Sequence, residues 1–459
     1  MRAIGLLAGL FALSSCGADR RPAELDLIVV SVDTLRADRL GLYVAERETD
    51  LGAADRWSPR WLGGQGTVFE SCWAPAGKTI PALATLWSGR DPLEHGAVTH
   101  MTVMQGPSFA EELRDRGYRT FARCANASVV EAYGIHRGFE DYARRPKEQE
   151  PRVVSELLAL ARPVLGSRQP VLLWAHLMAP HQPYEPSAEH DLWSDPDGLR
   201  ATNEVLYGLH RDPALADEPT TAQMKALYDG EVRASSSLVR DLLAGLDALY
   251  RDAGRGGLLE NAVVVFTADH GEELGDRHGY FLHGKSLYSG VIQVPLVIAG
   301  PGWKAGARRP GGVALADVVP LALGRHAAER RHFVSTWQRE FYSIRDQRWT
   351  LVNCPCDHLP DGPHEPPYPN GGGRYPYPRV ALYDRDADPL ESTDVAASHP
   401  QEVRRLLAGL GEWLDGLDLA EVQPFPRTEA NQGAWDTLVH PAWFAVDGCR
   451  PTPPEAWPD

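Results

Sequence analysis

The stretch LDLIVVSV at residues 25–32 is an apolar, β-branched run that leads directly into Asp33. Three further runs share this pattern: Pro170–His176, Ala262–Thr267 and Pro295–Ala299. Continuous rather than alternating apolar runs are typical of parallel strands that are buried on both faces. The four runs therefore predict a parallel sheet at the centre of the fold.

Helical patterns alternate with these strands over Thr79–Trp87, Val153–Ala161 and Thr221–Tyr250. Alternation of strands and helices predicts an α/β fold with a doubly wound, mostly parallel sheet. Its ligands are expected at the carboxyl ends of the strands.

The chemistry-bearing residues of the sequence follow these predicted strand ends. Asp33 ends the first run, Asp269 and His270 follow the third, and the segment His176–His181 follows the second. The sequence thus predicts a site at one edge of the sheet.

The pattern changes after about residue 325. Phe341–Val352 and Val380–Tyr383 are typical of antiparallel strands, and Pro400–Leu414 predicts one amphipathic helix. We therefore expect a catalytic α/β domain at 16–325, a smaller C-terminal α+β subdomain at 326–420 and a Pro/Trp-rich tail at 421–459. A long Gly/Pro-rich loop at 353–379 interrupts the subdomain, and its glycines at 371–373 predict a flexible loop.

Charge limits the possible partners. The formal net charge is −16, which weighs against nucleic acid and anionic membrane surfaces as partners. Hydrophobic residues make up 43% and charged residues 24%, so the chain is expected to fold into a globule. A small anionic substrate would require a local positive site.

The N-terminus predicts export. Arg2 precedes the apolar run Ile4–Leu13, which is about half the roughly 20 residues that span a bilayer. Residues 1–15 therefore read as a signal peptide. The end LSSC resembles the bacterial lipobox, which implies a lipid anchor at Cys16 and a periplasmic or outer-membrane lipoprotein of the cell envelope. A plain secretory signal is the alternative.

Four residues together favour a divalent-cation site: Asp33, Thr79, Asp269 and His270. Thr79 lies in GKTIP, where Pro81 predicts the first turn of a helix, and a helix N-terminus favours an anion. By itself Thr79 would be interpreted as a helix cap. Beside a metal ion its hydroxyl becomes a candidate nucleophile.

Five stretches resemble the sulfatase family of the alkaline phosphatase superfamily. They occur in family order and comprise SVDTLRADRLGLY (31–43), CWAPAGKTIPALATLWSGRDPLEHG (72–96), HLMAPHQPYEP (176–186), FTADHGEELGDRHGYFLHGKSLYSGVIQVPLVIAGPG (266–302) and LYDRDADPLESTDVAASHP (382–400). The resemblance implies an alkaline phosphatase-like fold and an ester hydrolase.

The resemblance also implies roles for individual residues. Thr79 falls on the nucleophile position, His181 contacts the substrate and protonates the leaving oxygen, and His283 holds the anionic oxygens of the ester. Lys78 and Lys285 add positive charge for substrate binding. One divalent ion (Zn, Mn, Mg or Ca) is implied, with the ligands Asp33, Thr79, Asp269 and His270.

The chain departs from the family at several positions. Sulfatases carry a C/S-x-P-x-R motif that is matured to formylglycine, whereas this chain has TIPAL, with Leu83 at the arginine position. Threonine there resembles the phosphoester branch of the superfamily. Thr34, Ala179 and Ser236 replace acidic residues of many relatives, so we expect one metal ion rather than two.

The leading hypothesis is a metal-dependent hydrolase of a phospho- or sulfo-ester, with phosphoester favoured. Its substrate would be a small anionic ester or a glycan- or lipid-linked ester. Alternatives are a divergent sulfatase, a phospho-group transferase and a lipid-anchored binding protein that has lost turnover. His95 and His100 are expected to be structural, with substrate contact as the less favoured alternative. The acidic turn at 384–388 is expected to be solvated.

Overall fold

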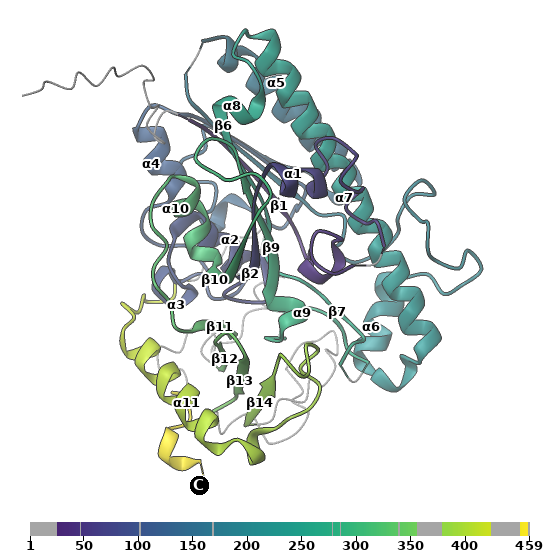
Figure 1. Cartoon of the computed structure of the whole chain (residues 1–459), viewed down its shortest axis with the longest axis vertical. Coiled ribbons are helices and arrows are strands. Elements are labelled where there is room, and N and C mark those ends of the chain that lie inside the picture. Colours follow the sequence, from purple (N-terminus) through teal and green to yellow (C-terminus); the bar gives the residue numbers. More distant parts are fainter. Residues whose placement is uncertain are drawn as a thin grey trace, which may run out of the picture.

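The structure is a computed structural model in which residues 25–45, 47–100, 102–167, 169–277, 279–284, 286–337, 340–355, 379–423 and 450–457 are described (Figure 1). Cys16 and the signal peptide, Lys285, the glycines at 371–373 and most of the tail lie outside these residues.

An eight-stranded sheet forms the centre of the molecule, in the order β10-β2-β9-β6-β1-β5-β3-β4. Its five parallel pairings include both neighbours of β1, the strand formed by LDLIVVSV. The predicted α/β fold with a large, mostly parallel sheet is confirmed. The strands are β1 (Asp26–Val32), β2 (Gly66–Trp73), β3 (Arg119–Cys124), β4 (Asp141–Arg144), β5 (Val171–Leu177), β6 (Ala262–Ala268), β9 (Gln293–Ala299) and β10 (Ala307–Ala314).

One strand direction was predicted wrongly. The apolar run Pro295–Ala299 lies in β9, which pairs antiparallel with both β2 and β6. All residues of β9 from Val294 to Ala299 are buried. A continuous apolar run indicates that a strand is buried on both faces of the sheet. A strand between two neighbours can be buried in this way whether it is parallel or antiparallel to them.

Helices cover both faces of this sheet. Figure 1 shows α5 (Pro151–Ser167) and α7 (Glu218–Asp252) on one side, and α2 (Thr79–Ser88), α4 (Phe109–Asp115) and α10 (Val318–Ala322) on the other. The three predicted helices are confirmed, and α5 and α7 extend beyond the predicted ends. No helix of the described residues combines the length and apolar character needed to cross a bilayer.

Shorter elements complete the larger domain. They are the helices α1 (Pro59–Gln65), α3 (Pro92–His95), α6 (Asn203–Arg211), α8 (Leu258–Asn261) and α9 (Ser289–Ile292), and the small hairpin of β7 (Glu273–Leu274) and β8 (Phe281–Leu282).

A second, antiparallel sheet lies below the carboxyl edge of the first in Figure 1. It runs β11 (Phe333–Trp337), β12 (Phe341–Arg345), β13 (Trp349–Asn353) and β14 (Val380–Asp384), and α11 (Pro400–Asp415) packs on it. The smaller C-terminal α+β unit is thus confirmed. Phe341–Val352 contains two strands, because Asp346 closes a turn by accepting the N–H groups of Arg348 and Trp349 at 2.8 and 2.7 Å.

The acidic turn that follows β14 was expected to be solvated, but its first carboxylate is paired. Asp384 accepts two hydrogen bonds from the guanidinium of Arg348, at 2.9 and 2.5 Å.

Buried polar contacts tie the C-terminal unit to the larger domain. Both carboxylate oxygens of the fully buried Glu391 accept hydrogen bonds from Ser289, from its N–H at 2.7 Å and from its hydroxyl at 2.9 Å. The buried Arg345 donates to the carbonyl of Leu287 at 2.6 Å. The smaller unit therefore holds the segment that follows His283.

We expect Glu391→Ala to lower the free energy of unfolding by about 3 kcal/mol or more, because it removes two hydrogen bonds to a charged acceptor and each contributes about 1.5–3 kcal/mol. Urea unfolding followed by tryptophan fluorescence measures the change. The matched control is Glu402→Ala, which removes a half-buried partner of Arg405 and should cost under about 1 kcal/mol. Equal effects of the two substitutions would contradict the role of Glu391.

Candidate active site

The site is built around Asp33, which follows the central strand β1. In the sheet register Val32 lies beside Leu177 of β5 and beside Ala268 of β6, so all three strands end at one place. Asp33 Oδ2 accepts a hydrogen bond from the side-chain amide of Asn126 at 2.9 Å and lies 3.3 Å from Nε2 of His176. Its carboxylate is fully buried.

Asp269 faces Asp33 from the end of β6. Its Oδ1 accepts the backbone N–H groups of Thr34 at 3.2 Å and His270 at 2.8 Å. Thr34 adopts a φ of 56°, which is uncommon for a β-branched residue and costs conformational energy. His270 Nε2 lies 3.5 Å from Asp269 Oδ2 and 3.8 Å from Asp33 Oδ1. The two carboxylates and this imidazole thus converge.

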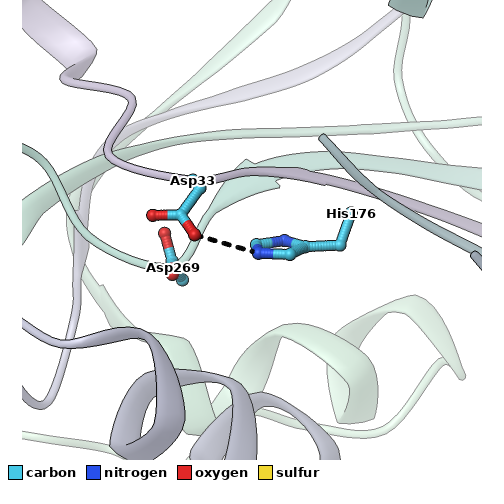
Figure 2. A group of neighbouring side chains, drawn as sticks. All are labelled: Asp33, His176 and Asp269. Atoms are coloured by element: carbon cyan, nitrogen blue, oxygen red, sulfur yellow. Dashed lines mark hydrogen bonds and ion pairs between the residues drawn. The ribbon is translucent and has the colours of Figure 1, made fainter. Parts of the chain in front are cut away.

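The donor atoms fit a divalent cation. Asp33 Oδ1, Asp269 Oδ2 and the hydroxyl of Thr34 are buried and have no hydrogen-bond partner among the described residues. Buried polar atoms without partners are costly, and carboxylate oxygens with imidazole nitrogens are common cation ligands. Figure 2 shows Asp33, Asp269 and His176, whose ligand atoms lie within 4.8 Å of one another.

His176 is a candidate ligand that the sequence analysis did not assign. It lies within β5, and its Nδ1 is 2.9 Å from the hydroxyl of Ser31, which fixes the ring and leaves Nε2 for Asp33. A lone histidine at the end of a buried apolar strand was the available signal. Asn126 was missed as well, because it lies in a loop after β3 whose path only the tertiary structure reveals.

Burial and mutual repulsion set the charge state of the two carboxyl groups. Burial and the charge of Asp33 raise the pKa of Asp269 well above its ordinary value. Burial also raises the pKa of Asp33. The hydrogen bond from His176 and the nearby imidazoles outweigh this effect and hold the pKa of Asp33 below its ordinary value. Burial lowers the pKa of His270 to about 3, so this imidazole is neutral and able to bind a cation.

Thr79 lies at the N-terminus of α2, directly beside these residues. Its hydroxyl is 3.5 Å from Asp33 Oδ2 and 3.4 Å from His270 Nε2. Lys78 occupies the cap position and Thr79 is the first residue of the helix, so its hydroxyl is not used as a cap. The structure therefore brings the four predicted metal ligands together.

Of the two predicted substrate-binding lysines, Lys78 lies among the described residues and contacts the C-terminal sheet. The ammonium of Lys78 lies 4.3 Å from the ring centroid of Trp337, the last residue of β11, in a cation–π contact. The C-terminal sheet thus reaches Lys78, the neighbour of Thr79 in the chain. Lys285 lies outside the described residues.

The two predicted catalytic histidines flank the same place. The ring of His283 lies 4.6 Å from that of His270 and 5.1 Å from that of His181. His283 Nδ1 is 3.0 Å from a carboxylate oxygen of the buried Glu272, a contact that the sequence analysis did not foresee. Glu272 fixes the ring and leaves Nε2 of His283 as the nitrogen available to a ligand.

Two further histidines were expected to be structural. The fully buried His95 fits this expectation, since its Nε2 lies 3.0 Å from the hydroxyl of Thr85 and its Nδ1 accepts the N–H of Ala97. His100 is only partly buried. Desolvation, followed by the charge of Lys78, lowers the pKa of His100 to about 3.

With this geometry in view, a comparison with protein families matches residues 26–325 to the family described as Sulfatase. The chain belongs to the sulfatase family. Arylsulfatase K of Gallus gallus is 27% identical to this sulfatase-family chain, over 87% of this chain and 85% of that relative. Arylsulfatase K of Rattus norvegicus is 22% identical over 57% of this chain, which spans only 54% of that relative's length.

Solved structures share the fold of this sulfatase-family chain. YidJ of Bacteroides fragilis matches with a TM-score of 0.64 at 15% identity, covering 88% of this chain and 97% of that one. The phosphonate monoester hydrolase SpPMH of Silicibacter pomeroyi matches with a TM-score of 0.59 at 17% identity, covering 88% and 100%.

We expect metal affinity to rise with pH, because ligands must be deprotonated and Asp269 holds its proton at pH values where an ordinary aspartate is ionised. Calorimetric titration with Zn²⁺ or Mn²⁺ in buffers of different ionisation enthalpy should show proton release on binding. Asp269→Asn should abolish binding, and His176→Gln should weaken it by about 10–100-fold, as loss of a ligand or of its supporting group does.

The matched control for these variants is Asp384→Asn, which alters a carboxylate paired with Arg348 outside the site and should leave affinity unchanged. Binding that is independent of Asp269, or that takes up protons, would contradict the assignment.

Proposed function

We propose that the chain is a metal-dependent hydrolase of a small anionic ester, with Thr79 as the nucleophile. The observation that supports this most is the position of the Thr79 hydroxyl, within 3.5 Å of both Asp33 Oδ2 and His270 Nε2 at the N-terminus of α2. A helix N-terminus favours an anionic ligand through its unpaired N–H groups and dipole.

The divalent ion, held by Asp33, Asp269, His270, Thr79 and His176, would supply Lewis-acid stabilisation of the threonine oxygen and the ester oxygens. The hydroxyl of Thr79 loses its proton to solvent, and its oxygen attacks phosphorus and forms a new P–O bond while the bond from phosphorus to the substrate's alcohol oxygen breaks. His181, once Nε2 has taken up a proton from solvent and the ring is an imidazolium, gives that proton to the departing alcohol. Water then hydrolyses the threonine ester, which restores the hydroxyl of Thr79. Lys78 and His283 bind the remaining anionic oxygens.

We favour a phosphoester over a sulfate ester because an unmodified threonine suits phosphorus chemistry and needs no maturation. The named activity of SpPMH, a relative in fold, is phosphonate monoester hydrolysis. Sulfate-ester hydrolysis is the second candidate, supported by the named activity of arylsulfatase K. Transfer to an alcohol instead of water would require only that the alcohol occupy the position of the attacking water.

A binding protein without turnover is the remaining alternative. It is motivated by Leu83, Ala179 and Ser236, which replace polar or charged residues of relatives. A protein that binds metal at full occupancy but hydrolyses none of the esters tested below would favour it.

We further propose that Cys16 carries a lipid anchor in the bacterial cell envelope, as its position after the apolar run 4–13 suggests. Labelling of the expressed full chain with radioactive palmitate should be lost in Cys16→Ser. Equal labelling of both forms would reject the anchor.

We expect Thr79→Ala to lower kcat by at least about 1000-fold, because removal of a nucleophile costs at least this much in well-studied hydrolases. Thr79→Ser keeps a hydroxyl and should retain measurable turnover. The assay uses 4-nitrophenyl esters of phosphate, methyl phosphate, phenylphosphonate and sulfate, with and without Zn²⁺ or Mn²⁺.

The control is Ser88→Ala at the other end of α2, which should leave kcat unchanged. Turnover that survives Thr79→Ala would reject the nucleophile. Turnover of the sulfate ester alone would favour the second candidate.

A further inference from the structure

The segment that carries His181 wraps around the side chain of one lysine. The ammonium of Lys147 donates to the carbonyl oxygens of His181 at 2.5 Å and Pro183 at 2.7 Å, and its third contact is a carboxylate oxygen of Glu231 at 3.3 Å. An ammonium has three N–H donors, so all three have partners. Lys147 comes from the loop before α5 and is distant in sequence from the segment that it holds.

Glu231 of α7 completes this clamp. The same carboxylate oxygen that contacts Lys147 also accepts the backbone N–H of Glu185 at 2.8 Å. The side chain of Glu231 is 6% exposed and that of Lys147 is 21% exposed, so the pair is shielded from water more than a surface ion pair. One buried carboxylate therefore neutralises the ammonium and fixes the far end of the segment.

A second carboxylate fixes the near end. A single side-chain oxygen of Glu150 accepts the backbone N–H of Met178 and, at 3.2 Å, that of Ala179. Lys147 is the first residue of a short turn, Lys147–Gln149, before α5, and Glu150 directly follows that turn. The side chains of Lys147 and Glu150 thus bind the segment 178–183 at both ends. Glu150 accepts its N–H groups at one end, and Lys147 donates to its carbonyl groups at the other.

These contacts determine the orientation of the His181 ring. Its Nδ1 lies 2.9 Å from the carbonyl oxygen of Gln182. A carbonyl oxygen only accepts, so Nδ1 carries a proton in both the neutral and the imidazolium ring, and Nε2 is the nitrogen that can take up a proton and give it to a ligand. The carbonyls on both sides of Gln182 in the chain, those of His181 and Pro183, are the two that Lys147 binds.

We propose that Lys147, neutralised by Glu231, is the positioning residue that aims Nε2 of His181 at the leaving oxygen of the substrate. This inference rests on the proposed function, in which His181 protonates the departing alcohol. Loss of the ammonium releases two backbone carbonyls, rotates the carbonyl between them and removes the acceptor that fixes the ring.

Leaving-group dependence distinguishes positioning from general stability. A proton donor matters for a poor leaving group such as phenol and little for a good one such as 4-nitrophenol. In Lys147→Met we expect kcat for the phenyl ester to fall at least about tenfold further than kcat for the 4-nitrophenyl ester, since misplacement of a reacting group by about 1 Å can cost about 100-fold. His181→Ala should show the same selectivity, and the double variant should be no worse than His181→Ala.

The control is Lys225→Met, because Lys225 is similarly exposed at 26% and similarly paired, with Asp276 at 2.5 Å. Lys225→Met should lower kcat for the phenyl and 4-nitrophenyl esters equally, or leave both values unchanged. Lys147→Arg keeps the positive charge beside Glu231 but moves the donors, so it should fold and still show the selective loss. Equal losses for both esters in the two Lys147 variants, or additive losses in the double variant, would overturn the proposal.

A second measurement tests whether Lys147 orients the His181 ring even if no Thr79-dependent turnover is found and the proposed function fails. Nitrogen NMR of ¹⁵N-histidine-labelled protein, with His181→Ala to assign the ring, reports which nitrogen carries the proton. We expect Nδ1–H in the wild type and a mixture of both forms in Lys147→Arg. An unchanged Nδ1–H form in that variant would overturn the positioning role.

Discussion

Two buried carboxylates, Asp33 and Asp269, face each other at the ends of adjacent parallel strands, and the rest of the site is arranged around their repulsion. Neither would be stable there as an isolated charge. Asn126 and His176 stabilise Asp33, while two backbone N–H groups stabilise Asp269. Oxygen atoms remain on both that no described side chain satisfies, and a divalent cation is the group whose charge and ligand preference meet that need.

The same constraint explains how an acidic chain can bind an anion. The net charge of −16 is spread over the whole molecule, whereas the N-terminus of α2 and Lys78 place positive charge at the site, and a bound cation would add to it. Trp337 holds the ammonium of Lys78 from the C-terminal sheet. That sheet also binds the segment after His283 through Glu391 and Arg345. The smaller unit therefore contacts both Lys78 and the segment after His283.

The sequence predicted those parts of the molecule that depend on local pattern. Apolar runs located β1, β5 and β6, and the residues after them located Asp33, Asp269 and His270. The direction of β9 was missed because burial, which the run reports, is the same in either direction. His176, Asn126 and Lys147 were missed because each acts through a partner distant in the chain, and a single sequence contains no signal for such a pairing. Glu272 was missed although its partner His283 is close in the chain, because the loop between them determines the contact.

The replacement of the family's arginine by Leu83 is consistent with a different source of positive charge at the nucleophile. Leu83 lies one turn after Thr79 and is fully buried, as are its neighbours Ala82 and Ala84, so α2 packs into the core at this point. A guanidinium there would require a buried partner, and burial without one is costly. Lys78 instead approaches from the cap position, where its stem crosses the edge of the core and its ammonium rests on Trp337. The described residues thus leave no space for a guanidinium at position 83, and the ammonium of Lys78 is a positive charge that lies beside Thr79 in the chain.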